Sequence, residues 1–105
     1  METNIRFAGE AGEGIQTAAD LLGRAMARSG RHAYAYTDAE SRIRGGLNFT
    51  HVRCSSEPVT GVTGRTDLLV ALSRRAVETF GSQVSKRGGI ICNHEWEHPR
   101  RLPVD

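Results

Sequence analysis

The chain of 105 residues has only two cysteines, a net charge of +2 and no long apolar run. Two cysteines, Cys54 and Cys92, cannot build a disulfide framework, so the sequence favours a reducing, cytoplasmic compartment. No window approaches the roughly 18–20 apolar residues of a membrane span, and the N-terminus has no signal-peptide pattern. The small net charge does not indicate a nucleic acid or an anionic membrane as a partner.

Aromatic residues are also scarce, at 6% of the chain, whereas glycine is abundant with 12 residues. A core without many rings must be built from Ala, Val, Leu and Ile, packed where backbones approach closely. The length suffices for one domain and not for a second with its own core. The composition therefore predicts one small, soluble, glycine-punctuated domain.

Hydrophobic periodicity divides the chain into strand, loop and helix units. A helical stripe begins at Ile15 and recurs at i, i+3 or i+4 as far as Met26, with Gly30 as a natural helix end. Ser73 is placed to cap a second helix, in which Val77, Phe80 and Val84 repeat on one side. Short β-prone runs predict strands at 5–8, 32–36, 47–54, 67–72 and 90–92.

The predicted order, β-α-β-β-β-α-β, is typical of an α/β fold with an open, Rossmann-like, mainly parallel sheet flanked by helices. The first β-α-β unit is expected to be parallel and right-handed. Gly23 lies within the first helix, where it suggests a close contact. Periodicity stops after Cys92, so we expect an α/β domain at 1–92, incomplete at its C-terminus, and an irregular tail at 93–105.

A glycine-rich loop follows the first predicted strand and contains Gly9, Gly12 and Gly14. Such a loop before a helix lets backbone N–H groups face an anion such as phosphate. Its order is the reverse of the dinucleotide pattern G-x-G-x-x-G, and two glutamates within it disfavour a bare pyrophosphate. A nucleotide-binding module is therefore one alternative, and glycines that only permit a tight turn are another.

The second candidate is a cationic turn made of Arg42, Arg44, Gly45 and Gly46. Two arginines beside paired glycines suit a carboxylate or a phosphate. The alternative is pairing with Glu40 or with a neighbouring subunit. A single RGG between strands does not resemble the repeated, disordered tails that bind RNA, so we exclude RNA.

A third pattern, His94-Glu95-x-x-His98, has the spacing of zinc hydrolases. That chemistry needs both histidines on one helical face and a third ligand elsewhere. A β-prone run ends directly before the pattern, and Pro99 disfavours helical geometry at His98. We therefore expect a polar tail, with neither a metal site nor catalytic residues, and a zinc hydrolase that uses His94, Glu95 and His98 stays as an alternative. His32 and His51 lie in β-prone runs and are expected to be structural.

Three segments, at 5–15, 40–46 and 67–72, resemble the gamma domain of the 2-oxoacid:ferredoxin (or flavodoxin) oxidoreductases. The sequence Glu-Ser-Arg-Ile-Arg-Gly-Gly at 40–46 is most similar to the copy at the N-terminus of the alpha subunit. The resemblance covers about 4–92. It makes Gly9, Gly12 and Gly14 the loop glycines of the family and places the arginine–glycine turn of the family at Arg42, Arg44, Gly45 and Gly46.

The resemblance implies an enzyme complex that decarboxylates a 2-oxoacid, forms acyl-CoA and reduces ferredoxin. Thiamine diphosphate, Mg²⁺ and an iron–sulfur cluster would be held by other domains or subunits, with no cofactor bound by this chain alone. The gamma domain would contribute assembly and the CoA side of the site, either through CoA or through a subunit interface. An isolated chain would be inactive and, with apolar surface exposed, would self-associate.

Overall fold

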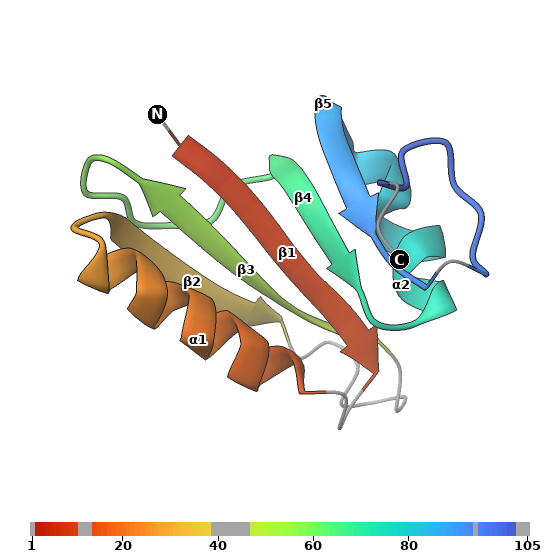
Figure 1. The fold of residues 1–105 in the computed structure, drawn as a ribbon, viewed down its shortest axis with the longest axis horizontal. Helices are drawn as coiled ribbons and strands as arrows, with labels where there is room; N and C mark the ends of the chain where they lie inside the picture. The colour runs from red at the N-terminus through yellow and green to blue at the C-terminus, as the bar shows by residue number, and fades with distance from the viewer. Residues whose placement is uncertain (1, 11–13, 39–46, 94, 103–105) are drawn as a thin grey trace.

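The computed structural model describes residues 2–10, 14–38, 47–93 and 95–102, which form a five-stranded sheet with helices on both faces (Figure 1). The elements follow the predicted order along the chain. They are β1 (Glu2–Glu10), α1 (Ile15–Arg28), β2 (His32–Asp38), β3 (Leu47–Ser55), β4 (Thr66–Ala71), α2 (Arg74–Phe80), the short 3₁₀ helix η2 (Gly81–Gln83) and β5 (Val84–Ile91).

The strands lie in the order β2-β3-β1-β4-β5. β1 pairs parallel with β4, which pairs parallel with β5, whereas β3 is antiparallel to both β1 and β2. β1 and β2 therefore run in the same direction, as predicted, but with β3 inserted between them. Because β3 alone among the described strands runs the other way, the α/β fold with a mainly parallel sheet is confirmed.

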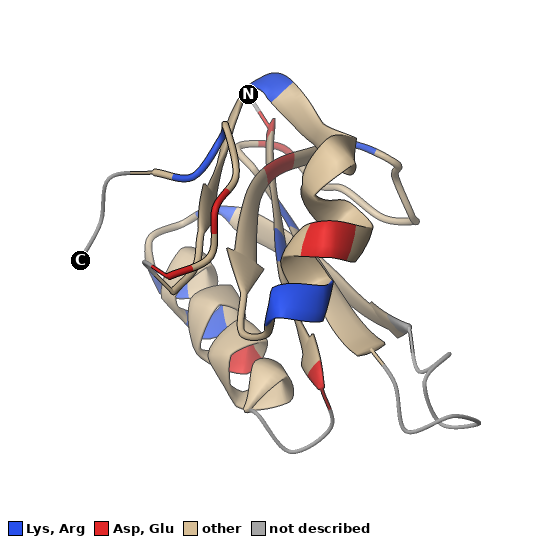
Figure 2. Ribbon diagram, turned by 90° about the vertical axis from the view of Figure 1, so that its right-hand side faces the viewer, with Lys and Arg blue, Asp and Glu red and all other residues tan. Residues whose placement is uncertain are grey.

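The two helices cover opposite faces of the sheet (Figure 2). α1 packs over β1, β3 and β2, and α2 packs over β1 and β4. The core on the α1 face consists of Phe7, Ile15, Ala19, Val52 and Cys54. The core on the α2 face consists of Ala8, Leu69, Ala71, Ala76, Val77, Phe80, Val84 and Ile90. Small aliphatic side chains dominate both layers, as the composition predicts.

The predicted helix ends are confirmed. Gly14 precedes α1 with a φ of 80°, and Gly30 follows its C-cap with a φ of 84°, conformations that glycine adopts without steric cost. The Ser73 hydroxyl accepts a hydrogen bond from the Ala76 N–H at 3.2 Å and so caps α2. Local sequence therefore determines where these helices begin and end.

The prediction for 81–92 is wrong in its boundaries. Val84 begins β5 instead of continuing the helix, because η2 ends α2 after Phe80. Gly88 and Gly89 lie within β5, where a Cβ at Gly88 would collide with a backbone carbonyl and one at Gly89 would lie 2.6 Å from Leu102. These glycines serve close packing between elements and not a turn.

Gly23 does not meet the close neighbour that its place in the helix suggests. A Cβ added there would have nothing within 4 Å in the described part of the chain.

The C-terminal segment follows the outer edge of β5. Ile90 forms an isolated parallel bridge with Arg101, through hydrogen bonds from the Ile90 N–H to Arg100 O (2.9 Å) and from the Leu102 N–H to Ile90 O (2.7 Å). Trp96 packs against the core on the α2 face. The domain boundary expected at residue 92 stays a prediction.

None of the helices in the described residues is long and apolar enough to cross a membrane.

Candidate functional site

The carboxyl ends of β1 and β4 are the point at which the connections of this sheet diverge. These strands are parallel neighbours, yet α1 leaves β1 toward one face and α2 leaves β4 toward the other. The Leu72 N–H donates to Ala8 O at 2.8 Å, which holds the two strand ends together. Open α/β sheets bind ligands in the crevice outside such a switch point, because the two diverging connections leave room there.

The described part of the glycine loop lies at the carboxyl end of β1. Gly9 is buried in β1 and is paired with Asn48, and Gly14 precedes the first turn of α1 in a left-handed conformation. Gly12 lies outside the described residues. The predicted boundary is wrong here: the strand expected at 5–8 extends over Glu2–Glu10, because Gly9 pairs with Asn48 of β3, and the loop begins only after Glu10. The chain then enters α1 through a position that favours glycine.

The arginine–glycine turn, with Arg42, Arg44, Gly45 and Gly46, also lies outside the described residues. The structure describes the strands on either side of this segment. β2 ends at Asp38, and β3 begins at Leu47, which is paired with Glu10 of β1. The two predicted segments therefore leave the sheet from the same edge, although 29 positions separate Glu10 from residue 39 along the chain. Local sequence patterns alone do not reveal this proximity, because the antiparallel insertion of β3 creates it.

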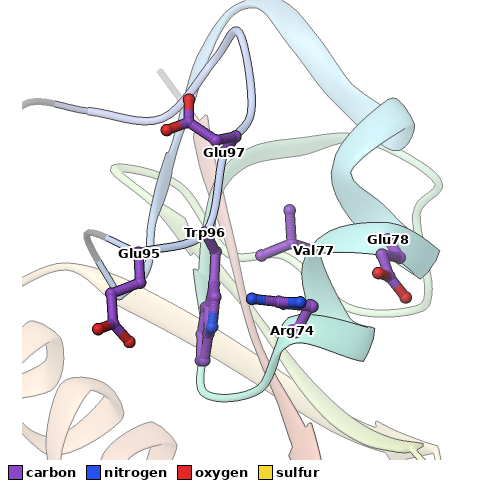
Figure 3. Close-up of a pocket in the computed structure, with 6 residues that line it drawn as sticks. All are labelled: Arg74, Val77, Glu78, Glu95, Trp96 and Glu97. Atoms are coloured by element: carbon purple, nitrogen blue, oxygen red, sulfur yellow. The ribbon is translucent and has the colours of Figure 1, made fainter.

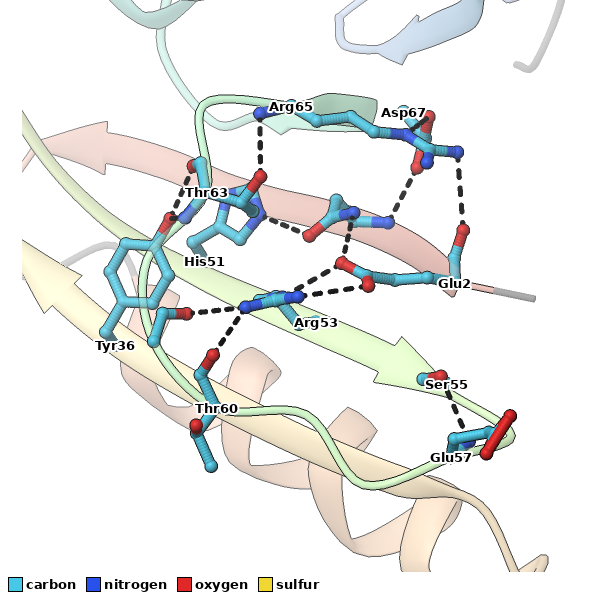
Figure 4. Close-up of polar contacts among 12 residues, drawn as sticks. Glu2, Tyr36, His51, Arg53, Ser55, Glu57, Thr60, Thr63, Arg65 and Asp67 are labelled. Carbon is cyan, nitrogen blue, oxygen red and sulfur yellow. Dashed lines mark hydrogen bonds and ion pairs between the residues drawn. The ribbon is translucent and has the colours of Figure 1, made fainter.

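A buried polar chain crosses the middle of β1 and β3 (Figure 4). The Arg6 Nε–H donates to His51 Nδ1 at 3.2 Å, so His51 must carry its proton on Nε2, which donates to Asn4 Oδ1 at 3.0 Å. Asn4 and His51 are fully buried, and the Arg6 guanidinium lies 3.8 Å from the Phe49 ring centroid. Tyr36 stacks on the imidazole with ring centroids 5.1 Å apart. Both ring nitrogens of His51 are thus satisfied.

The chain of hydrogen bonds continues to the amino end of β1. The Asn4 side-chain amide donates to Glu2 at 2.9 Å, and Glu2 forms a two-pronged ion pair with Arg53 at 2.9 and 3.0 Å. The hydrogen bond from Arg53, together with that from Asn4, lowers the pKa of Glu2 to about 2. Asp67 accepts the Asn4 backbone N–H at 2.8 Å. These contacts fix β1, β3 and β4 relative to one another.

Burial, followed by the nearby charges of Arg6 and Arg53, lowers the pKa of His51 to about 4, so the ring is neutral near pH 7. The structural role predicted for His51 is confirmed by these contacts. Sequence reasoning missed Arg6 and Asn4, although polar residues in a strand covered on both faces are a signal that such a network exists. The network supports the sheet and is not placed at the crevice.

A cavity of about 260 Å³ lies beside the first turn of α2 (Figure 3). It is lined by Arg74, Val77, Glu78, Glu95, Trp96 and Glu97. The Arg74 side chain points toward the Trp96 ring, and three glutamates, Glu78, Glu95 and Glu97, also line the cavity. Three carboxylates against one guanidinium disfavour a phosphate, so this cavity does not suit the anionic part of a nucleotide.

The metal pattern at His94 and His98 lacks the required geometry in its described part. Residues 95–98 form no helix, and His98 Nδ1 accepts the Arg100 N–H at 3.1 Å while its other edge lies against Gly81. Within the described ranges no group of three or more His, Cys, Asp or Glu could hold a metal ion, and His94 lies outside them. Burial raises the pKa of both Cys54 and Cys92, which disfavours the reactive thiolate.

Comparison with known proteins decides the family. Residues 4–105 match the model of the pyruvate ferredoxin/flavodoxin oxidoreductase domain. The chain belongs to this family. The match includes the C-terminal segment that the sequence resemblance does not cover, and it confirms the relationship inferred from the glycine loop, the arginine turn and β4.

Two curated relatives are similar to this chain in sequence. A 2-oxoglutarate synthase subunit KorC of Methanocaldococcus jannaschii is 28% identical over 98% of this chain and 56% of its own length. A 2-oxoacid:ferredoxin oxidoreductase alpha subunit of Sulfolobus is 33% identical over 73% of this chain and 12% of its own. The chain thus spans about half the length of the first and a small part of the second.

Two solved structures share the fold. A 2-oxoglutarate:ferredoxin oxidoreductase from Magnetococcus marinus, with 2-oxoglutarate, coenzyme A and succinyl-CoA bound, superimposes with a TM-score of 0.76 at 28% identity, over 99% of this chain and 18% of that one. The gamma subunit of a keto/oxoacid ferredoxin oxidoreductase from Geobacter sulfurreducens superimposes with a TM-score of 0.80 at 22% identity. The match covers 96% of this chain and 57% of that one. The α/β fold is that of the gamma subunits.

Proposed function

We propose that this chain is a gamma-type domain of a 2-oxoacid:ferredoxin oxidoreductase, and that it contributes assembly and the CoA side of the site. The complete enzyme would decarboxylate a 2-oxoacid to acyl-CoA and pass the electrons to ferredoxin. The family match over residues 4–105 is the observation that carries this proposal. The Magnetococcus marinus enzyme, described with coenzyme A bound, supports the choice of ligand.

The carboxyl edge of the sheet is the part of the chain that we assign to CoA or to a partner subunit. The glycine loop (Gly9, Gly12, Gly14) leaves this edge from β1. The turn with Arg42, Arg44, Gly45 and Gly46 leaves it between β2 and β3. Guanidinium groups bind phosphates in two-pronged geometry, and glycines let a ligand approach the backbone closely.

The redox and decarboxylation chemistry would be supplied by other subunits or domains, which would hold thiamine diphosphate, Mg²⁺ and the iron–sulfur cluster. Two cysteines are too few for a cluster with four thiolate ligands, and they lie on different strand ends. In this proposal the isolated chain is inactive and the chain acts by binding and orienting. A cytoplasmic location belongs to the same proposal and rests on the low cysteine content.

Steady-state kinetics of the assembled enzyme test the CoA assignment. The variant R42A/R44A should raise the KM for CoA at least tenfold and leave the KM for the 2-oxoacid unchanged, because only the CoA phosphates would lose their partners. The control R75A removes one exposed guanidinium from the outer side of α2. Loss of the complex on gel filtration, with an unchanged KM for CoA in the fraction of enzyme that stays assembled, would instead assign the turn to a subunit interface.

A stand-alone nucleotide-binding module is the second candidate, since a glycine loop does precede α1. Calorimetric titration of the isolated chain with CoA, NAD and ATP separates the two. Micromolar binding of NAD or ATP would support the module and contradict the family role, whereas heats at the dilution baseline for both nucleotides would remove this candidate.

A further inference from the structure

The two edges of the sheet differ in how they are protected. The β5 edge is followed by the chain itself, which bridges Ile90 to Arg101, and β5 carries two exposed cations, Lys86 and Arg87. Natural sheets block unwanted strand pairing with such devices. β2 forms the opposite edge, and no described residue pairs with its outer side (Figure 1).

β2 lacks the residues that usually blunt an edge strand. Its sequence is HAYAYTD over His32–Asp38, with no proline or lysine and no charge between its first and last residues. Ala33, Ala35 and Thr37 are exposed, although they lie on the face of the sheet that α1 covers. Tyr34 and Tyr36 are half-buried on the other face, with ring centroids 6.2 Å apart. The edge is therefore long, regular and accessible.

The strand is also complementary to itself. When two copies run antiparallel about Ala35, Tyr34 of each lies opposite Tyr36 of the other, and Ala33 lies opposite Thr37. Aromatic pairs at directly opposed positions stabilise antiparallel strands. Each contact from one copy to the other is repeated in the reverse direction, so the pairing is symmetric, as a two-fold dimer requires.

We propose that a second copy of this chain binds along β2, and that the two sheets join into one through antiparallel β2 strands. The register is centred on Ala35. Tyr36 is already held in place, since its hydroxyl donates to Thr63 O at 2.9 Å, so little side-chain freedom is lost on pairing. The carboxyl end of β1 lies two strands away from this edge. This inference goes beyond the proposed function and does not depend on it.

Crosslinking through introduced thiols tests the register. In the variant A35C the two thiols lie directly opposite each other, with Cβ atoms about 4.5–5.5 Å apart, which is close enough for a disulfide after small adjustments. In the matched variant T37C, whose own cross-strand partner is Thr50 and not a cysteine, the thiols are four residues out of step, about 13 Å apart along the strands. Mild oxidation followed by a non-reducing gel should give a dimer band in A35C that is at least tenfold stronger than in T37C.

Equal crosslinking of the two variants, or no more crosslinking in A35C than in the unaltered chain, would overturn the proposal.

A second measurement does not depend on introduced thiols. The variant A35K places two like charges at the two-fold axis and should convert the dimer into a monomer in sedimentation equilibrium. The control V62K adds a charge at an exposed loop position (75% exposed) and should stay dimeric. An unaltered chain that is monomeric at every concentration, or an A35K dimer, contradicts the proposal.

Discussion

The buried imidazole of His51 predicts a specific loss of stability in acid. His51 has a pKa of about 4 in the folded protein, against 6.5 in an unfolded chain, because burial and the charges of Arg6 and Arg53 disfavour its protonation. Between these values the unfolded chain binds a proton that the folded protein does not. The free energy of unfolding therefore decreases as the pH falls through this window. Glu2 acts in a separate, lower window, since its pKa of about 2 affects stability only below pH 4.5.

The size of the effect follows from the two pKa values. Each unit of difference corresponds to about 1.4 kcal/mol, so the full shift corresponds to about 3.4 kcal/mol. Between pH 7.5 and pH 4.5 the folded protein should lose about 2.5 kcal/mol through this group alone. Protonation would also turn His51 Nδ1 into a donor facing the Arg6 Nε–H, which removes the hydrogen bond that joins the two side chains.

Urea unfolding at half-unit steps between pH 7.5 and pH 4.5 measures the slope. His51→Gln cannot titrate, so its curve should be flatter than that of the unaltered chain by about 2.5 kcal/mol over this range, whatever its stability at neutral pH. His32→Gln makes the same replacement at an exposed position and serves as the matched control. Parallel curves for the unaltered chain and for His51→Gln would refute the reasoning.

Three further substitutions test packing and capping by thermal or urea unfolding. Gly23→Ala should stabilise the protein by about 0.5–1 kcal/mol, because a Cβ there meets nothing within 4 Å and the helix gains propensity; a loss would reveal a contact that the structure lacks. Gly88→Ala should destabilise it by about 2–3 kcal/mol, since the new Cβ would collide with the backbone carbonyl of Asp67, and an unchanged midpoint would contradict that packing. Ser73→Ala should cost about 1 kcal/mol by leaving the Ala76 N–H without its cap, whereas Ser82→Ala, at an exposed position, should cost much less.

Local chemistry explains which parts of the fold are predictable from the sequence. The start of α1 after Gly14, its end before Gly30 and the cap at Ser73 depend on residues within a few positions, and all three are confirmed. The end of α2 was not predicted, because Val84 continues a helical spacing although η2 intervenes. The need for glycine at position 88 was not predicted either, because it comes from the close approach of Asp67 in β4, 21 positions away along the chain.

Long-range pairing explains what sequence patterns miss. The antiparallel insertion of β3 between β1 and β2 leaves no local trace, yet it brings the flanks of the glycine loop and of the arginine turn to one edge. The network of Arg6, His51 and Asn4 likewise joins residues more than 40 positions apart. The segments of the candidate site could therefore be recognised from the sequence. Their proximity in space could not, because it depends on the order of the strands in the sheet.

Affinity capture of the tagged chain from its native cells tests the central claim most directly. The account predicts that a thiamine diphosphate-dependent subunit is recovered with the chain in near-equal amount, and that the captured material reduces ferredoxin when given a 2-oxoacid and CoA. The R42A/R44A variant, captured in parallel, would report whether the arginine turn is needed for assembly. Recovery of the chain without such a subunit, and without that activity, would contradict the account.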